Sequence, residues 1–257
     1  MSKFLVIGER CTDIFIYGKA NRLSPEAPVP VFVPINEVKS YGMAFNVFRN
    51  LKAMHDESKN LNYIVSKKAP TKTRFVDDKT NHYFLRMDSA EKWDRIQFTD
   101  ANLSKIKQAN CIIISDYNKG FLTEEDILLI REVNKTAKIF LDTKKMVSKK
   151  ILQAVDFLKM NQTEWQNNLL NENFKKFAYS KLHSKIIVTL GDEGAMYNCE
   201  LFESVEVVKT LDVSGAGDTF LAGLANSYME FGDIKFSITI ANLCASEVVK
   251  KRGVSIL

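Results

Sequence analysis

The most informative segment of this 257-residue chain reads Asp212-Val213-Ser214-Gly215-Ala216-Gly217-Asp218-Thr219-Phe220-Leu221-Ala222-Gly223. Its glycines let the backbone approach a ligand closely, and the apolar pattern that follows predicts a helix. The backbone amides of Gly215, Ala216 and Gly217 would lie at the positive start of that helix and form an anion hole for a transferring phosphoryl group. Asp218 would face an attacking hydroxyl group. The helix end should keep its carboxylate ionised, so that it accepts the hydroxyl proton.

The same segment has a purely structural interpretation. Ser214 would cap the helix and Asp218 would complement the helix dipole. A bare Gly-x-Gly-Asp string would favour that interpretation. Here the segment begins after a strand-like run and continues into a long helical pattern, so we favour the catalytic interpretation.

The composition is that of an ordinary globular protein, with 46% hydrophobic and 26% charged residues. Disordered and fibrous classes are therefore excluded. No apolar run has the length of a membrane span, and residues 1–8 predict a buried strand, not a signal peptide. The four cysteines are scattered, as is typical of thiols in a reducing compartment. We expect a cytoplasmic protein without a membrane partner.

The net charge of +5 fits a nucleic-acid partner or a binder of phosphorylated small molecules. The lysines are spread along the chain, and the densest group reads as a solvated helix surface: Lys144, Lys145, Lys149 and Lys150. No basic face with interleaved aromatic residues is evident, so nucleic acid is not an expected partner.

Short runs rich in Val, Ile and Phe alternate with longer segments of helical period. The predicted strands are 3–8, 61–66, 111–115, 138–141, 156–159 and 185–190. The predicted helices are 44–55, 99–108, 123–136, 174–182, 216–231 and 234–251. Because several strands are apolar almost throughout, we expect a doubly wound α/β fold: a mostly parallel sheet with helices on both faces.

Two regions break this alternation. Residues 15–38 hold strand-like pieces around a Pro-rich turn, and residues 73–87 hold two more β-type runs. We interpret them as a small antiparallel β lid, formed from about 13–38 and 72–88, on a single domain of residues 1–257. An exposed strand edge in this lid would need a cover.

The Gly-Ala-Gly-Asp core at 215–218 resembles the C-terminal signature of the ribokinase-like (PfkB) carbohydrate kinases, with Ser214 where the family usually has Thr. The resemblance runs nearly from end to end. It implies a ribokinase-like fold, a sugar as phosphoryl acceptor, ATP and Mg²⁺ as cofactors, and Asp218 as catalytic base. No Walker A string occurs, which disfavours a P-loop mechanism.

Two further strings match the nucleotide half of that family. Lys159-Met160-Asn161-Gln162-Thr163-Glu164 is similar to its Asn-x-x-Glu element. The resemblance places Lys159 and Asn161 beside the nucleotide and assigns Glu164 to Mg²⁺, largely through water. The alternative is that Asn161 and Glu164 are only a helix cap and its partner.

The second string, Val188-Thr189-Leu190-Gly191-Asp192-Glu193-Gly194, resembles the turn that lies against the nucleotide phosphates, which implicates Thr189, Gly191 and Gly194. Asn242 falls where the family lines the adenine pocket. A simple turn after a strand and a helix-surface Asn are the structural alternatives.

The N-terminal half resembles the kinases of heptose 7-phosphate. The matching strings include Tyr17-Gly18-Lys19, Asn21 to Val31, Lys72-Thr73-Arg74, Leu85-Arg86-Met87-Asp88 and Ser115-Asp116-Tyr117-Asn118-Lys119-Gly120. A substrate that already carries a phosphate needs cationic partners. Our candidates are Arg74, Arg86 and Lys119, with Asp13 and Asp116 for sugar hydroxyls.

Three departures from that group concern the sugar side. Glu9 stands where the relatives have Asp, and it remains a substrate-binding candidate. The family's Gly-Gly-Ala-x-Asn-Val string is replaced by Tyr41-Gly42-Met43-Ala44-Phe45-Asn46-Val47. Gly42 and Asn46 are retained as candidates, while Met43 and Phe45 add bulk near the sugar. The segment from 54 to 71 is shorter than in the family.

Three functions follow for comparison. The first is an ATP-dependent sugar kinase, acting on a phosphorylated sugar similar to heptose 7-phosphate. The second is a non-catalytic sensor of phosphosugar or nucleotide, derived from the kinase fold. The third, a nucleic-acid-binding protein, rests only on the basic pI near 8.8. Because relatives often pair such lids across a two-fold axis, we also expect a homodimer.

Overall fold

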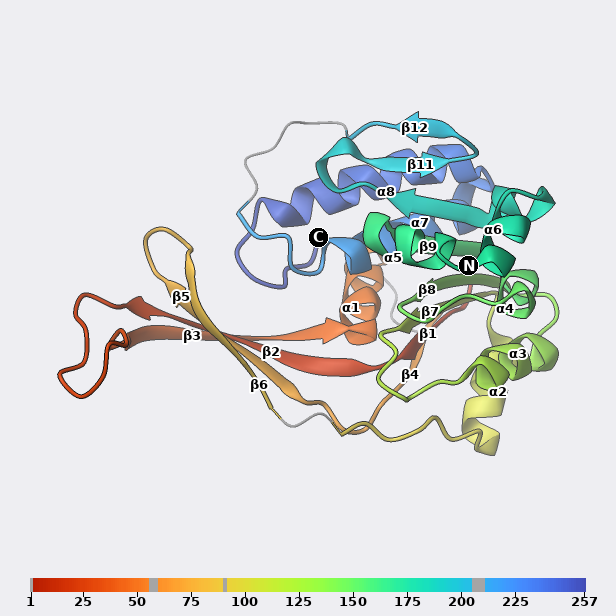
Figure 1. The fold of residues 1–257 in the computed structure, drawn as a ribbon. Coiled ribbons are helices and arrows are strands. Elements are labelled where there is room, and N and C mark those ends of the chain that lie inside the picture. The colour runs from red at the N-terminus through yellow and green to blue at the C-terminus, as the bar shows by residue number, and fades with distance from the viewer. Residues whose placement is uncertain (1, 56–59, 90–91, 205–210) are drawn as a thin grey trace.

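An eight-stranded sheet lies at the centre of the molecule, in the order β12-β11-β10-β9-β8-β7-β1-β4 (Figure 1). The computed structural model describes residues 2–55, 60–89, 92–204 and 211–257. The strands are β1 (Phe4–Gly8), β4 (Leu61–Val65), β7 (Cys111–Asp116), β8 (Lys138–Thr143), β9 (Phe157–Asn161), β10 (Ile186–Thr189), β11 (Ala195–Tyr197) and β12 (Glu200–Phe202). The neighbouring strands β4, β1, β7, β8, β9 and β10 pair in parallel, and β11 and β12 add an antiparallel hairpin.

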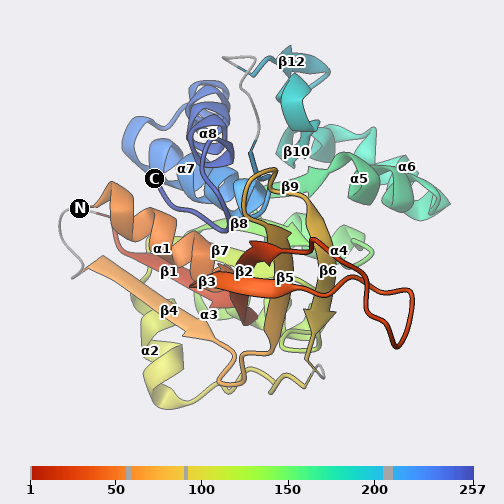
Figure 2. The same ribbon diagram turned by 90° about the vertical axis from the view of Figure 1, so that its left-hand side faces the viewer.

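Helices cover both faces of this sheet (Figure 2). One face carries α2 (Asp100–Gln108), α3 (Glu124–Val133), α4 (Lys149–Ala154), α5 (Gln162–Leu169) and α6 (Glu172–Ala178). The other carries α1 (Ala44–Met54), α7 (Ala216–Phe231) and α8 (Ile234–Val249). Successive residues of β1 alternate between the two cores: Leu5 and Ile7 enter the first, Phe4 and Val6 the second. Within the described ranges, no helix combines the length and apolarity of a membrane span.

The predicted doubly wound α/β fold is confirmed. All six predicted strands belong to the parallel part of the sheet, and each of the six predicted helices corresponds to an observed one. The sequence did not reveal α4 and α5, which are short, or the β11–β12 hairpin, whose strands have three residues each.

A second sheet projects from the body as a long arm (Figures 1 and 2). It contains β2 (Arg10–Lys19), β3 (Val33–Met43), β5 (Thr71–Asp77) and β6 (Tyr83–Asp88), in the order β3-β2-β5-β6. We call these four strands the arm. The central pair β2–β5 is parallel, so the expectation of a purely antiparallel flap was wrong. The arm also extends beyond the predicted limits, because β2 begins directly after the body strand β1 and β3 continues into α1.

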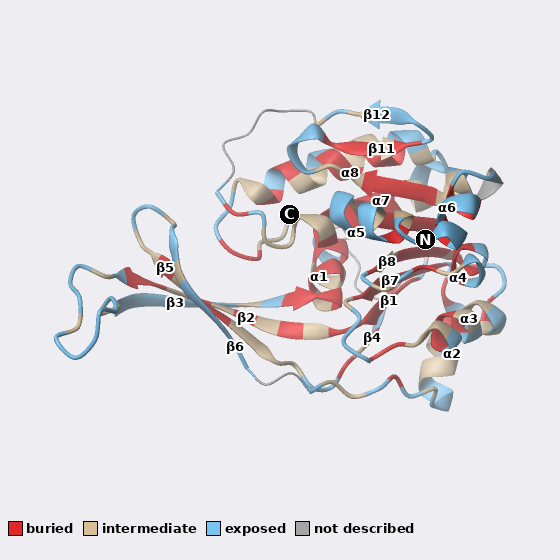
Figure 3. Cartoon of the chain, viewed as in Figure 1, coloured by how far each residue is buried: buried red, intermediate tan, exposed pale blue. Residues whose placement is uncertain are grey.

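The base of the arm is attached to the C-terminal part of the chain. Phe15, Tyr17 and Val76 of the arm form a small apolar cluster with Val254. The hydroxyl of Tyr83 on β6 donates a hydrogen bond to Asp212 Oδ2 at 2.8 Å. Burial decreases toward the outer end of the arm, whereas the central body strands β1 and β7 are buried along their length (Figure 3). The arm base is therefore fixed against the segment that precedes α7.

Candidate active site

Two cavities meet at the start of α7. The first, of about 410 Å³, lies between the arm and the body, and we call it the arm cavity. Of the predicted site residues it is lined by Asp13, Gly42, Arg74, Arg86, Lys119, Gly215 and Asp218. The second, of about 580 Å³, we call the α7–α8 cavity. Its predicted lining residues are Thr189, Gly191, Gly194, Ala216, Gly217 and Asn242.

The start of α7 depends on a left-handed glycine. Gly215 is the N-cap with φ of 87°, and a Cβ there would lie 2.7 Å from Asn46 Nδ2. Both the backbone conformation and this contact therefore disfavour a side chain at this position. The amide of Ala216 already donates to the carbonyl of Val213 at 3.2 Å. The predicted anion hole therefore narrows to the amides of Gly215 and Gly217.

Asp218 is 3% exposed and holds one donor on each carboxylate oxygen. The Tyr117 hydroxyl donates to Oδ1 at 2.9 Å, and Asn46 Nδ2 donates to Oδ2 at 3.3 Å. Burial raises the pKa of Asp218 to about 7, with the hydrogen bond from Tyr117 opposing the rise and the charge of Asp142 adding to it. The sequence suggested that the positive helix end keeps the Asp218 carboxylate ionised. In the structure, desolvation by burial is the larger effect on its pKa. A carboxylate poised near neutrality is suited to accepting a proton.

Glu9 and Asp116, which were predicted to contact the sugar, do not line the arm cavity. Glu9 is fully buried and accepts hydrogen bonds from the backbone amides of Tyr117 and Lys119, both at 2.9 Å. Asp116 is 1% exposed and accepts from Lys145 Nζ and from the hydroxyl of Thr143. Both carboxylates shape the loop that carries Tyr117.

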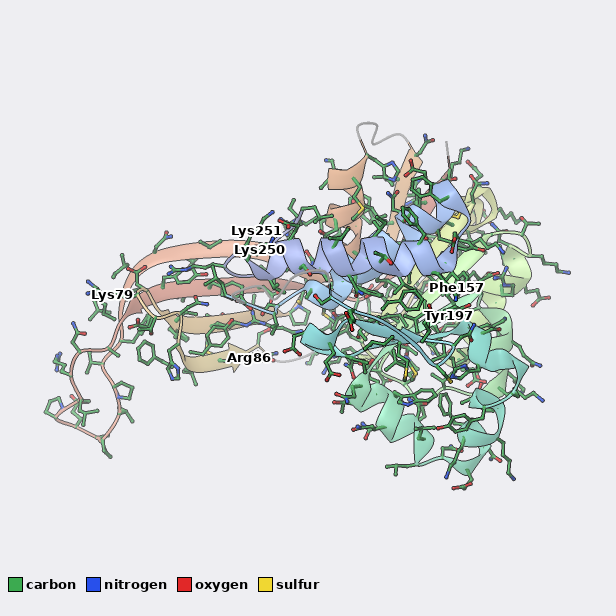
Figure 4. The ribbon with its side chains drawn as sticks, turned by 90° about the horizontal axis from the view of Figure 1, so that it is seen from above. Lys79, Arg86, Phe157, Tyr197, Lys250 and Lys251 are labelled. Carbon is green, nitrogen blue, oxygen red and sulfur yellow. The ribbon has the colours of Figure 1, made fainter. Side chains whose placement is uncertain are left out.

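Two arginines that were assigned to a substrate phosphate are already paired. Arg74 Nη1 lies 2.6 Å from Asp13 Oδ1, and both side chains are buried. Arg86 forms a bidentate pair with Asp88, with both distances at 2.8 Å. Gly42 makes room for this arrangement, because a Cβ there would lie 2.1 Å from Asp13 Oδ2. Figure 4 shows Arg86 on the arm near its junction with the body, whereas Lys79 lies further out.

The α7–α8 cavity brings together four of the residues predicted to bind the nucleotide, Thr189, Gly191, Gly194 and Asn242, whereas Lys159 and Asn161 do not line it. Gly191 and Gly194 have φ of 69° and 105°, which the tight turn between β10 and β11 requires. Asn242 is buried and its amide donates to the carbonyl of Phe202 at 2.8 Å. This hydrogen bond fixes α8 to the β11–β12 hairpin, so the amide NH₂ group of Asn242 has a structural role.

Lys159, Asn161 and Glu164 lie close together in the chain, where β9 ends and α5 begins. Asn161 and Glu164 form a reciprocal capping box at the start of α5, as in the structural alternative. Lys159 is buried and pairs with Asp142, its neighbour in the strand register, at 2.8 Å. A Cβ on Gly217 would lie 3.1 Å from Lys159 Nζ. The lysine ammonium therefore approaches the proposed anion hole.

Asp142 is a site residue that sequence reasoning missed. It lies near the carboxyl end of β8, at the same sheet edge as Asn161. Burial and the charge of Asp142 raise the pKa of Glu164. The described residues contain no group of three His, Cys, Asp or Glu side chains that could hold a metal. The carboxylates of Glu164 and Asp142 nonetheless fit a hydrated Mg²⁺, since this ion keeps several waters and needs only one or two carboxylates from the protein.

The interpretation of Lys144 and Lys145 as solvated helix surface was wrong. Both follow β8 in a loop, before α4 begins. Lys145 pairs with buried Asp116. Lys144 lines the arm cavity, with Nζ 4.7 Å from the ring centre of Tyr117. Their position directly after a predicted strand was the only sequence signal for this.

A scan against family profiles agrees with this geometry. The profile described as "pfkB family carbohydrate kinase" matches residues 48–257. The chain belongs to this family of sugar kinases.

Among curated proteins, similar relatives include the bifunctional protein HldE of Helicobacter pylori strain J99, 30% identical over 302 residues and 98% of this chain. HldE of Nitratiruptor sp. is 29% identical over 289 residues, again covering 98% of this chain. The chain spans 64% and 62% of the length of these two relatives.

Solved structures show the same fold at low sequence identity. Ribokinase of Arabidopsis thaliana, complexed with ribose and ATP, has a TM-score of 0.70 and 16% identity, covering 98% of this chain and 94% of that one. Phosphofructokinase-2 of Escherichia coli, in complex with potassium, has a TM-score of 0.71 and 14% identity, covering 100% and 95%.

Proposed function

We propose that this protein transfers the γ-phosphate of ATP to a hydroxyl of a sugar that already carries a phosphate, similar to heptose 7-phosphate. One observation carries the proposal: the first turn of α7 separates two cavities. Ala216 and Gly217 line the α7–α8 cavity, while Gly215 and Asp218 line the arm cavity. ATP in the first cavity and a sugar in the second would meet at this turn, as in-line transfer requires.

Each group at this turn has a role in the proposed reaction. Asp218 accepts the proton of the attacking hydroxyl, while Tyr117 and Asn46 orient its carboxylate. The amides of Gly215 and Gly217 stabilise charge on the transferring group. Glu164 and Asp142 would hold a hydrated Mg²⁺, which when bound neutralises charge on the nucleotide phosphates.

We also propose that the arm is a lid and that it pairs with the arm of a second copy of the chain. The strand register places Ile16, Phe75 and Leu85 in one row across the arm, and Ile14 and Met87 in the next. Leu85 and Met87 are 57% and 54% exposed. The arm cavity is lined from the opposite face, so this apolar face is available to a homodimer in the cytoplasm.

The test is release of ADP from ATP and Mg²⁺ with a panel of free and phosphorylated sugars. We expect stimulation by one phosphorylated sugar. Asp218→Asn should lower kcat by roughly a hundred- to ten-thousandfold because the base is lost, with ATP binding kept. Asp100→Asn, at an exposed position in α2, is the matched control. Full kcat in Asp218→Asn would refute the assignment of the base. Bound ATP with no response to any sugar would favour a sensor instead.

A further inference from the structure

Two lysines approach the ring of Tyr117 from different parts of the molecule. Lys72 belongs to β5 of the arm, and its Nζ lies 5.7 Å from the ring centre. Lys144 belongs to the loop after β8 in the body, and its Nζ lies 4.7 Å from the same centre. The hydroxyl of Tyr117 contacts Asp218. All four residues line the arm cavity.

The other charges of this cavity largely cancel. Arg74 is neutralised by Asp13, and Arg86 by Asp88. Among the described residues, no ion pair within 4.0 Å joins a carboxylate to Lys72 or Lys144. Two ammonium groups that share one aromatic ring repel each other. The cation–π contacts compensate only part of this repulsion.

A dianion between the two lysines would satisfy both charges. A lysine ammonium is a compact point charge on a flexible stem, which suits the oxygens of a phosphate group. Arginines 74 and 86 are less suited, because each already uses its guanidinium on a carboxylate. The strand register sets Lys72 between Asp13 and Asp88, on the face of the arm that lines the cavity.

We propose that Lys72 and Lys144 form a phosphate-binding pair that bridges the arm and the body beside Asp218. The ligand group is a phosphate, delivered either by the sugar substrate or as the γ-phosphate of ATP. This inference rests on the proposed function for the identity of the ligands. Phosphate binding itself is measurable without turnover.

The first experiment measures thermal stabilisation by inorganic phosphate. Lys72→Met and Lys144→Met keep the apolar stem of each side chain and remove its charge. Lys79→Met, on the outer part of the arm (Figure 4), is the matched control. We expect phosphate to raise the Tm of the wild type and of Lys79→Met, with the rise lost in the double variant. An equal rise of Tm in the double variant, or no rise in the wild type, would overturn the proposal that Lys72 and Lys144 bind phosphate.

Kinetics with the active sugar then distinguish the source of the phosphate. If the sugar supplies it, each variant raises KM for the phosphorylated sugar by roughly ten- to hundredfold and leaves KM for ATP unchanged. If ATP supplies it, kcat falls and KM for the sugar is kept. Unchanged kinetics in both variants contradict the pair. Absence of turnover in the wild type would instead refute the proposed function, and the phosphate titration would still decide the pair.

Discussion

The carboxylate of Asp218 is buried, and its burial brings its pKa into the range that suits a catalytic base. Its pKa is raised to about 7, chiefly by desolvation, whereas the hydrogen bond from Tyr117 lowers it. The ionised fraction therefore increases as the pH rises through neutrality. A base that must be ionised to act imposes the same dependence on the rate.

We expect kcat/KM to decline below about pH 7, roughly tenfold for each further pH unit. Tyr117→Phe removes a hydrogen bond that favours the ionised form, so its acid limb should move to higher pH. The measurement is the pH profile of kcat/KM for both proteins. A uniform loss of rate at every pH, with no displacement of the limb, would show that Tyr117 only supports the loop.

At the scale of elements, the junction between β3 and α1 is strained. Met43 ends β3 with φ of 62° and ψ of −143°, a region that is nearly reserved for glycine. The family resemblance noted for residues 41–47 implies Gly-Gly where this chain has Gly42-Met43. Met43 is 3% exposed and lines the arm cavity. Its side chain thus occupies part of the cavity at a cost in backbone energy.

Comparison of Met43→Ala with Met43→Gly isolates this strain. Both variants lose the same buried side chain, but only glycine relaxes the backbone. We expect the glycine variant to have the larger free energy of unfolding, by about 1–3 kcal/mol. In an ordinary strand or helix, alanine is favoured by about 0.5–1 kcal/mol. Denaturant unfolding measures the difference, and a larger free energy of unfolding for the alanine variant would contradict the strain at Met43.

Sequence patterns predicted the elements better than the contacts between them. Helix α7 occupies the predicted residues 216–231, because its glycine start and apolar period are local signals. Gly191 and Gly194, which line the α7–α8 cavity, were implicated by the family resemblance. Tyr117, Asp142 and Lys144 were not recognised, since each becomes a site residue only when neighbouring strands place their carboxyl ends together.

Glu9 and Asp116 were predicted to contact the sugar, and the structure gives each carboxylate partners within the protein. Both are charged residues at the ends of strands, which is a good general sign of a ligand site. Their carboxylates are instead used to hold the backbone around Tyr117 and the side chain of Lys145. Only the arrangement in space distinguishes a group that binds a ligand from one that supports its neighbour.

At the scale of the whole molecule, the apolar outer face of the arm predicts a dimer. Leu85→Glu places a charge on this face, in the edge strand β6, and we expect it to yield a monomer because a buried unpaired charge disfavours association. Light scattering at micromolar concentration measures the mass of both proteins. Lys79→Glu provides a control charge on the same arm. A monomeric wild type would contradict the dimer.

The two attachments of the arm also bear on the fate of ATP when no sugar is present. They are the hydrogen bond from Tyr83 to Asp212 and the apolar cluster with Val254, and beyond them Lys72 of the arm and Lys144 of the body approach the same ring. A phosphate held by both lysines would draw the arm down and exclude water from Asp218. Without a bound phosphate, the repulsion between the two lysines is not compensated and this closing force is absent. When the sugar supplies this phosphate, the closed arrangement forms only with the acceptor present, and futile hydrolysis of the nucleotide is restrained until then.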